Sequence, residues 1–214
     1  TRTDPEAPKH KGISLFLVDM RSPGITVNRL VNMAGIHHFN EVFFEEVHVP
    51  KENRVGEENQ GWYYLAVALD FERSGVRRPA EARRTLEELV DYARQARSNG
   101  QSLADQPVIR NKLAQTAIEI EVGRYLAYRV AWMQGQGLVP NYEASMSKVW
   151  GSELGQRLAN VGMQLLGLRG LLDGDSRWAP LRGSLESLYL STVGETIAAG
   201  TSEIQRNIIA LRGL

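Results

Sequence analysis

Short apolar runs, each bounded by turn-forming residues, dominate the first fifty positions of the chain. One run covers residues 13–18 and is followed by a Ser-Pro-Gly turn, and β-branched residues fill 25–27. A third run extends over 39–49 and stops at Pro50, which has no N–H for further strand pairing. Three short strands are too few to enclose a core, so we expect them to be the end of a larger sheet.

From about Gly61 onward the apolar residues recur every three or four positions, which is the spacing of one face of an α-helix. This period predicts five helices, over residues 61–97, 106–134, 141–167, 184–197 and 201–211. Gly75 and Pro79 lie inside the first of these segments, and either residue can kink or break a helix.

Side chains that cap helix N-termini precede two of the predicted helices. Asp105 is placed to cap the second helix, with Pro107 in its first turn, where a missing N–H does no harm. Thr201 or Ser202 is placed to cap the last helix.

The change of period predicts an α+β chain by segment. A partial β-barrel or sheet comes first, and an all-α domain of the four-helix-bundle type follows it. We place the boundary so that residues 1–55 are the C-terminal part of a β domain and residues 56–214 form the helical domain.

Composition excludes several classes of partner and site. The chain carries 25 basic and 25 acidic residues, so its net charge does not favour binding to nucleic acid or to an anionic membrane. It contains no cysteine, which excludes disulfides, thiolate metal sites and cysteine nucleophiles. No apolar run reaches the roughly 18 residues of a membrane span. We therefore predict neither a nucleic-acid nor a membrane partner.

Two adjacent histidines, His37 and His38, raise the question of a metal site. Neighbouring residues of a strand point to opposite faces, whereas metal ligands must converge. A position at a sheet edge or in a loop explains these residues better, and we predict no metal.

The stretch Leu69-Asp70-Phe71-Glu72-Arg73 is the strongest candidate for chemistry. It places two carboxylates and an arginine in an otherwise apolar helical run. Asp70 and Glu72 point about 200° apart on a helix, so they do not act as a pair. A buried carboxylate beside an apolar ligand has a raised pKa, which suits a general base near neutral pH. A structural contact between Glu72 and Arg73 is the alternative, and the pattern alone leaves both open.

Five segments in a fixed order carry a resemblance to a known family. They read KGISLFLVD with PGITV, then FFEEVHVP, VGEENQGW and GTSEIQRN, and they begin at residues 11, 23, 43, 55 and 200. Together they resemble the later strands of the middle β domain and the C-terminal helical domain of the acyl-CoA dehydrogenases. The resemblance extends over essentially the whole chain.

The resemblance implies an FAD-dependent oxidoreductase. Family members remove the α-proton of an acyl-CoA thioester with a carboxylate and pass the β-hydrogen as hydride to FAD, which then reduces an electron-transfer flavoprotein. It also implies a homo- or hetero-oligomer, a dimer or tetramer, and its bacterial character implies a cytoplasmic location. Since the family's N-terminal domain and first strands do not precede this segment, we expect the segment alone to be inactive.

The position of the catalytic base separates subgroups of the family. Many members have a glutamate directly before the Gly-Thr of the last motif, where this chain has Ala199. Members that resemble isovaleryl- and long-chain acyl-CoA dehydrogenases instead carry the base in a Leu-Asp-x-Glu-Arg motif, onto which Glu72 and Arg73 map. The resemblance therefore implies Glu72 as the base and Arg73 as its neighbour at the substrate. Glu195 is a competing carboxylate.

Further matches imply a set of cofactor-binding residues. Thr201 matches the threonine that contacts FAD, and Glu203 lies where the family has a flavin-contacting residue. Gln164 matches the glutamine that reaches the adenine half of FAD from a neighbouring subunit. Arg97 and Ser98 lie near the family's pyrophosphate-binding arginine.

The chain also departs from the family's cofactor pattern. Leu168 replaces the second glycine of a pair, Asn99 replaces a phenylalanine, and Pro107 replaces a later glutamine. With Ala199, these departures favour an alternative function, the non-catalytic partner subunit of a hetero-oligomeric acyl-CoA dehydrogenase. A helical scaffold that only oligomerises is a third reading. The sequence pattern does not specify the acyl group of the substrate, because the shape of an apolar pocket sets the length and branching of that group.

Overall fold

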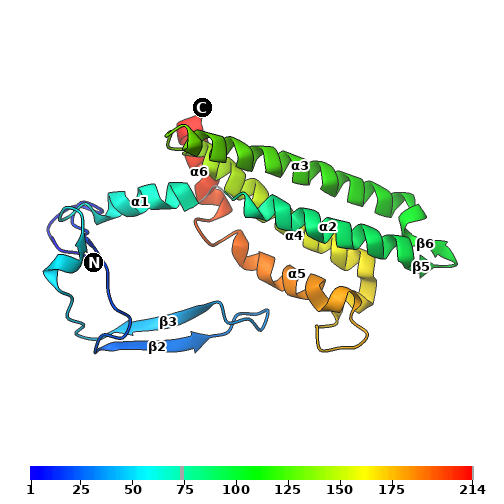
Figure 1. Ribbon diagram of the computed structural model, residues 1–214, viewed down its shortest axis with the longest axis horizontal. Helices are drawn as coiled ribbons and strands as arrows, with labels where there is room; N and C mark the ends of the chain where they lie inside the picture. Colours follow the sequence, from blue (N-terminus) through cyan, green and yellow to red (C-terminus); the bar gives the residue numbers. More distant parts are fainter. Residues whose placement is uncertain (73–74, 214) are drawn as a thin grey trace. The chain divides into compact units, whose positions relative to one another are not determined.

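The computed structural model describes the backbone of residues 1–72 and 75–213, and the side chains of residues 1–69 and 75–213 (Figure 1). The chain divides into two compact units, Thr1–Leu69 and Asp70–Leu214. The division falls inside the first helix, some residues beyond the boundary at 55 and 56 that the change of sequence period predicts.

The first unit contains short antiparallel strand pairs. β1 (Leu15–Phe16) pairs with β4 (Arg54–Val55), and β2 (Ile25–Leu30) pairs with β3 (Phe39–Phe44) so that Ile25 lies opposite Phe44. A 3₁₀ turn, η1 (Lys51–Asn53), precedes β4. All three predicted strands are present, and the described strands form no closed barrel. The run predicted over 39–49 ends at Phe44, because Glu46 has φ 49° and breaks the extended backbone.

The helix predicted over 61–97 is two helices. α1 (Gly61–Glu72) and α2 (Arg77–Gln95) are separated near Gly75, whose φ of 67° belongs to the left-handed region. Pro79 lies in the first turn of α2, where its missing N–H has no intrahelical partner to lose. The predicted weak point at Gly75 is thus the break, and Pro79 is accommodated inside α2.

The remaining helices match the periodic segments closely. They are α3 (Pro107–Gly135), α4 (Tyr142–Leu166), α5 (Ser184–Glu195) and α6 (Ser202–Gly213), with short 3₁₀ segments η2 (Leu103–Asp105), η3 (Gly167–Leu171) and η4 (Pro180–Gly183) between them. None of the helices in the described residues is long and apolar enough to cross a membrane.

The predicted capping of α3 by Asp105 is wrong. Asp105 ends η2, and Gln106 is the residue before the helix, with φ −74° and ψ 120°. A residue before proline is pushed out of the helical region, so Pro107 at the first helical position makes Gln106 the boundary. In contrast, Thr201 caps α6 as predicted, since its Oγ1 accepts a hydrogen bond from the Ile204 N–H at 3.3 Å.

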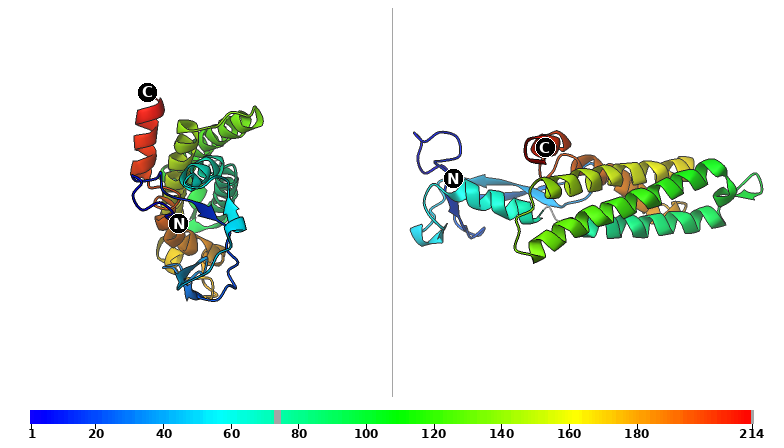
Figure 2. Two further views of the ribbon diagram at one scale, coloured as in Figure 1. Left: turned by 90° about the vertical axis from the view of Figure 1, so that its left-hand side faces the viewer. Right: turned by 90° about the horizontal axis from the view of Figure 1, so that it is seen from above.

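The second unit is a helical bundle in which α2, α3 and α4 lie side by side, with α5 and α6 packed on α4 (Figures 1 and 2). Its core is aliphatic and comes from four helices: Leu86, Leu89 and Ala93 of α2, Leu113 and Ile120 of α3, Leu154, Leu158 and Leu166 of α4, and Leu185 of α5. Gly162 brings α4 and α5 together, because a Cβ there would overlap the Leu185 side chain. The bundle confirms the predicted all-α second part.

Candidate functional site

A polar pocket of 470 Å³ lies where the N-terminus of α6 meets α4. We call it the α6 pocket, and its lining comes from α4, from the α5–α6 turn and from α6: Glu153, Gln156, Arg157, Asn160, Thr196, Ile197, Thr201, Ser202, Glu203 and Arg206. Its volume is within the range of small-molecule sites. The structure thus brings Thr201 and Glu203, two of the residues implied by the resemblance, into one pocket.

Local hydrogen bonds set the charge of Glu203. The carboxylate accepts from its own backbone N–H and from the Thr201 hydroxyl, and nearby Arg206 and Lys148 attract it, so its pKa is held below the usual 4.5 despite some opposing desolvation. Glu203 is exposed at the first turn of α6, where the helix dipole also favours an anion. The pocket therefore contains a fixed negative charge at neutral pH.

Ion pairs on α4 form the opposite wall of the α6 pocket. Arg206 donates to Glu153 at 2.7 Å, and Arg157 donates to Glu119 of α3 at 2.6 Å. Burial alone would raise the pKa of Glu119, but hydrogen bonds from Gln115 and Arg157 and the attraction of Arg157 lower it. Sequence reasoning missed these residues, since charged helix positions usually face solvent.

The turn before α6, residues 196–200, has an unusual backbone. Ala199 and Gly200 both have positive φ, 55° and 93°. Alanine is uncommon in this region, so neighbouring contacts must hold the conformation. The Thr196 carbonyl accepts from the Ser202 N–H at 3.0 Å, and the Ala199 carbonyl accepts from Gln205 Nε2 at 3.2 Å.

Arg97 and Ser98 lie away from the α6 pocket, on an exposed hairpin beyond the end of α2. Arg97–Ser98 (β5) pairs with Gln101–Ser102 (β6), and the two-residue loop between the strands, Asn99 and Gly100, has φ 53° and 82° (Figure 1). The Asn-Gly dipeptide is the usual signature of such a tight hairpin. That signal was available in the sequence, and it gives Asn99 a structural role.

Gln164 lies on the last turn of α4, at the same end of the bundle as this hairpin (Figure 2). Its Oε1 accepts a hydrogen bond from Lys112 Nζ, in the first part of α3. Lys112 was not foreseen as a member of this group. Leu168, two residues beyond α4, is 86% exposed. The candidate cofactor residues of one chain therefore form two groups, one at the α6 pocket and one at the hairpin end.

Comparison with known proteins decides the family. The sequence profile described as "Acyl-CoA dehydrogenase, C-terminal domain" matches residues 59–214. The chain belongs to the acyl-CoA dehydrogenase family. It is 31% identical over 215 residues to the acyl-CoA dehydrogenase IpdE1 of Mycobacterium tuberculosis, and the match covers all of this chain and 53% of that protein.

Solved acyl-CoA dehydrogenase structures share the fold. The chain is similar to the Tcur3481–Tcur3483 steroid ACAD G363A variant, with a TM-score of 0.91 and 30% identity over 99% of this chain and 55% of the other. It is also similar to the ChsE4–ChsE5 complex from Mycobacterium tuberculosis, with a TM-score of 0.88 and 32% identity over 100% of this chain and 55% of the other. The chain spans about half the length of these relatives.

In this acyl-CoA dehydrogenase chain, the two residues of the predicted base motif fall partly outside the described residues. Glu72 is the last residue of α1, its side chain is outside the described part, and Arg73 lies outside it altogether. The competing carboxylate, Glu195, ends α5 with its Oε2 4.0 Å from Arg78 Nε. It lines a pocket of only 60 Å³, which is too small for an acyl chain.

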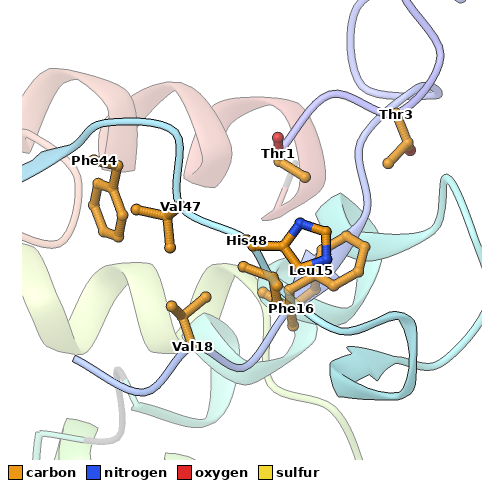
Figure 3. Close-up of a pocket in the computed structure, with 9 residues that line it drawn as sticks. Thr1, Thr3, Leu15, Phe16, Val18, Phe44, Val47 and His48 are labelled. Carbon is orange, nitrogen blue, oxygen red and sulfur yellow. The ribbon is translucent and has the colours of Figure 1, made fainter. Parts of the chain in front are cut away.

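The first unit of this family member has a pocket of its own, of 680 Å³ (Figure 3). Thr1 and Thr3 lie on one side of it, and the other lining residues come from two segments. These are β1 with Val18 after it, and Phe44 at the end of β3 with Val47 and His48 after it. None of the predicted site residues lines this pocket. Its neighbouring hairpin exposes apolar side chains, with Val27 47% and Phe44 58% exposed, so the space is an open side of a short sheet.

The histidines show no convergence. His37 Nε2 lies 2.6 Å from Asn40 Oδ1, which fits a loop position beside β3. Within the described ranges, no group of three or more His, Cys, Asp or Glu side chains could hold a metal ion.

Proposed function

We propose that this chain is the C-terminal part of an FAD-dependent acyl-CoA dehydrogenase. The observation that carries the proposal is the α6 pocket, in which the Thr201 hydroxyl and an ionised Glu203 lie side by side in a chain of this family. The Thr201 hydroxyl accepts from the Ile204 N–H and donates to the Glu203 carboxylate, so the two side chains form one polar group at the pocket.

The chemistry of the side chains suits FAD. The α6 pocket offers hydroxyl, carboxylate, amide and guanidinium groups, which match the alternating donors and acceptors along a flavin edge. The buried Ser202 hydroxyl in its wall has no hydrogen-bond partner among the described residues. At the hairpin end, Arg97 and Lys112 supply positive charge for a pyrophosphate, and Gln164 supplies an amide.

The separation of these two groups supports an oligomer. The hairpin lies at one end of the bundle and α6 toward the other, and α3 alone is about 40 Å long (Figure 1). We propose that the cofactor lies between the α6 pocket of one subunit and the hairpin end of another. Two similar structures bear two-protein names, so the second subunit is either a copy or a related chain.

The proposed reaction depends on side chains that the structure describes and on others that lie outside the described residues. We propose that Glu72 takes the α-proton of the acyl-CoA thioester and that Arg73 helps to hold the site. When bound, FAD supplies the acceptor for the β-hydride. Thr201 and Glu203 would orient the cofactor, and an electron-transfer flavoprotein would reoxidise it.

An anaerobic titration tests this function. The intact protein that contains this chain is followed by its visible spectrum while straight-chain, branched and steroid-side-chain CoA thioesters are added in turn. We expect bound flavin whose absorbance bleaches with one class of thioester, and that class is the substrate. A preparation without flavin, or flavin that no thioester bleaches, would reject the proposal and favour a non-catalytic partner subunit.

The base is tested by a matched pair of variants. Glu72→Gln should reduce turnover at least about 1,000-fold without lowering the melting temperature, because it removes only the proton acceptor. Glu195→Gln, which neutralises the competing carboxylate, should keep turnover. The opposite ranking of the two variants would assign the base to Glu195.

A further inference from the structure

A lysine is the largest fully buried side chain in the bundle. Lys148 of α4 is 1% exposed, although lysine is among the residues least often buried completely. A buried ammonium must be hydrogen-bonded if it is to keep its charge. Its Nζ donates to the backbone carbonyl of Glu195 at 3.2 Å.

The acceptor of this hydrogen bond has a particular place in the fold. Glu195 is the last residue of α5, so its carbonyl is one of those that a helix leaves without an intrahelical partner. The C-terminal end of a helix also carries partial negative charge, which attracts a cation. Lys148 therefore fixes the end of α5 to α4 by both a hydrogen bond and a charge.

The residues that follow are the strained turn 196–200 and the first turn of α6. Gln156 of α4 donates to the Thr192 carbonyl at 3.1 Å and to Thr196 Oγ1 at 3.2 Å. Gln205 of α6, which is fully buried, donates to the Ala199 carbonyl. Lys148 belongs to this set of α4 and α6 side chains that hold the turn from both helices.

The charge of Lys148 also acts on the α6 pocket itself. It is one of the two cations whose attraction helps to keep the pKa of Glu203 low, the other being Arg206. Arg206 also forms an ion pair with Glu153 at the surface, whereas Lys148 is shielded from solvent by its burial.

We propose that Lys148 is a positioning residue that holds the α5–α6 turn, so that Thr201 and Glu203 are presented to the bound flavin. This inference rests on the proposed function for its last step. As a positioning residue, Lys148 needs no contact with substrate or cofactor. It acts through the Glu195 carbonyl and the turn.

The test compares Lys148→Met with a core variant of similar burial in the intact protein. Lys148→Met removes the charge and the donor but keeps an unbranched chain of similar length. Leu89→Ala removes buried apolar volume from α2, away from the turn. Lys148→Arg, which retains a cation and donors, is the conservative variant.

Two readouts separate positioning from stability. Hydrogen exchange of the peptide covering 194–206 should speed up at least about tenfold in Lys148→Met relative to the rest of the bundle, and FAD affinity should fall by about the same factor. Leu89→Ala should change neither preferentially, and Lys148→Arg should recover part of both.

Equal exchange in the turn and in the bundle of Lys148→Met, or the same loss of FAD affinity in Leu89→Ala, would overturn the inference. If the wild-type protein binds no FAD, the proposed function fails separately. The exchange rates then decide alone whether Lys148 holds the turn.

Discussion

The buried residues of α4 and its neighbouring helices are of two chemical kinds, apolar and polar. Toward α2 and α3, α4 presents leucines such as Leu154 and Leu158, and this apolar seam forms the core. A second set of buried residues is polar, and this polar seam comprises Ser145, Lys148 and Ser152 of α4, Thr192 of α5, and Ser202 and Gln205 of α6. Apolar contacts are non-directional, whereas hydrogen bonds fix a geometry. The comparison teaches that the first seam stabilises the bundle and the second orients the turn at the α6 pocket.

The largest effect on stability is expected in the apolar seam. Leu89→Ala should lower the free energy of unfolding by about 2–5 kcal/mol, because Leu89 is fully buried and its neighbours cannot close the cavity completely. Chemical denaturation of the helical signal measures it. A loss below about 1 kcal/mol would show that the apolar seam is not the main source of stability.

Gln205→Ala tests the polar seam and should lower the free energy of unfolding by about 1–3 kcal/mol. The substitution removes the fully buried Gln205 side chain and the hydrogen bond that it donates to the Ala199 carbonyl. Its control is Gln115→Ala, an exposed glutamine on α3 that bonds Glu119, which should change stability by less than about 0.5 kcal/mol. Equal effects of the two variants would mean that burial of Gln205 contributes nothing.

Thr201→Ala should destabilise α6 by about 1 kcal/mol, since it removes the hydrogen bond to the Ile204 N–H. It should also raise the pKa of Glu203, because the Thr201 hydroxyl helps to keep that pKa low. Thr201→Ser retains the hydroxyl and should leave both nearly unchanged. Thermal melting and an NMR titration of the carboxylate check the two effects, and an unshifted pKa would contradict the second.

A smaller effect is expected from acid at the α3–α4 contact. The folded pKa of Glu119 lies below its ordinary value of 4.5, so the stability that its ionisation contributes is fully present above that pH. This contribution is lost as the pH falls through the lowered pKa. The stability of Glu119→Gln should therefore decline less between pH 5 and pH 3 than that of the wild type, and identical slopes would argue against the contribution.

The helices could be predicted because their buried apolar residues recur every three or four positions in the sequence. The second predicted helix, over 106–134, is α3 (Pro107–Gly135). Helix ends were less predictable, because they depend on local competition, as at Gln106 before Pro107. The hairpin at Asn99 and Gly100 had a recognisable signal that helical periodicity overshadowed.

The candidate site was only partly accessible from the sequence. Thr201 and Glu203 lie in a recognisable motif, and the structure puts both at the α6 pocket. Lys148 was missed because a lysine among serines on a helix is usually solvated, and hydrophobic periodicity does not detect a buried polar stripe. Its signal is the spacing of Ser145, Lys148 and Ser152, which repeats every three or four positions on one face.

The tight loop at Asn99 and Gly100 also bears on how the chain folds. It reverses the chain within two residues, so α2 and α3 are neighbours in sequence as well as in space. Contacts between such neighbours have little loop-closure entropy to overcome and form early. The α2–α3 pair can therefore act as a folding nucleus on which α4 docks. The polar seam, in which Lys148 bonds a residue 47 positions along the chain, would then be completed last.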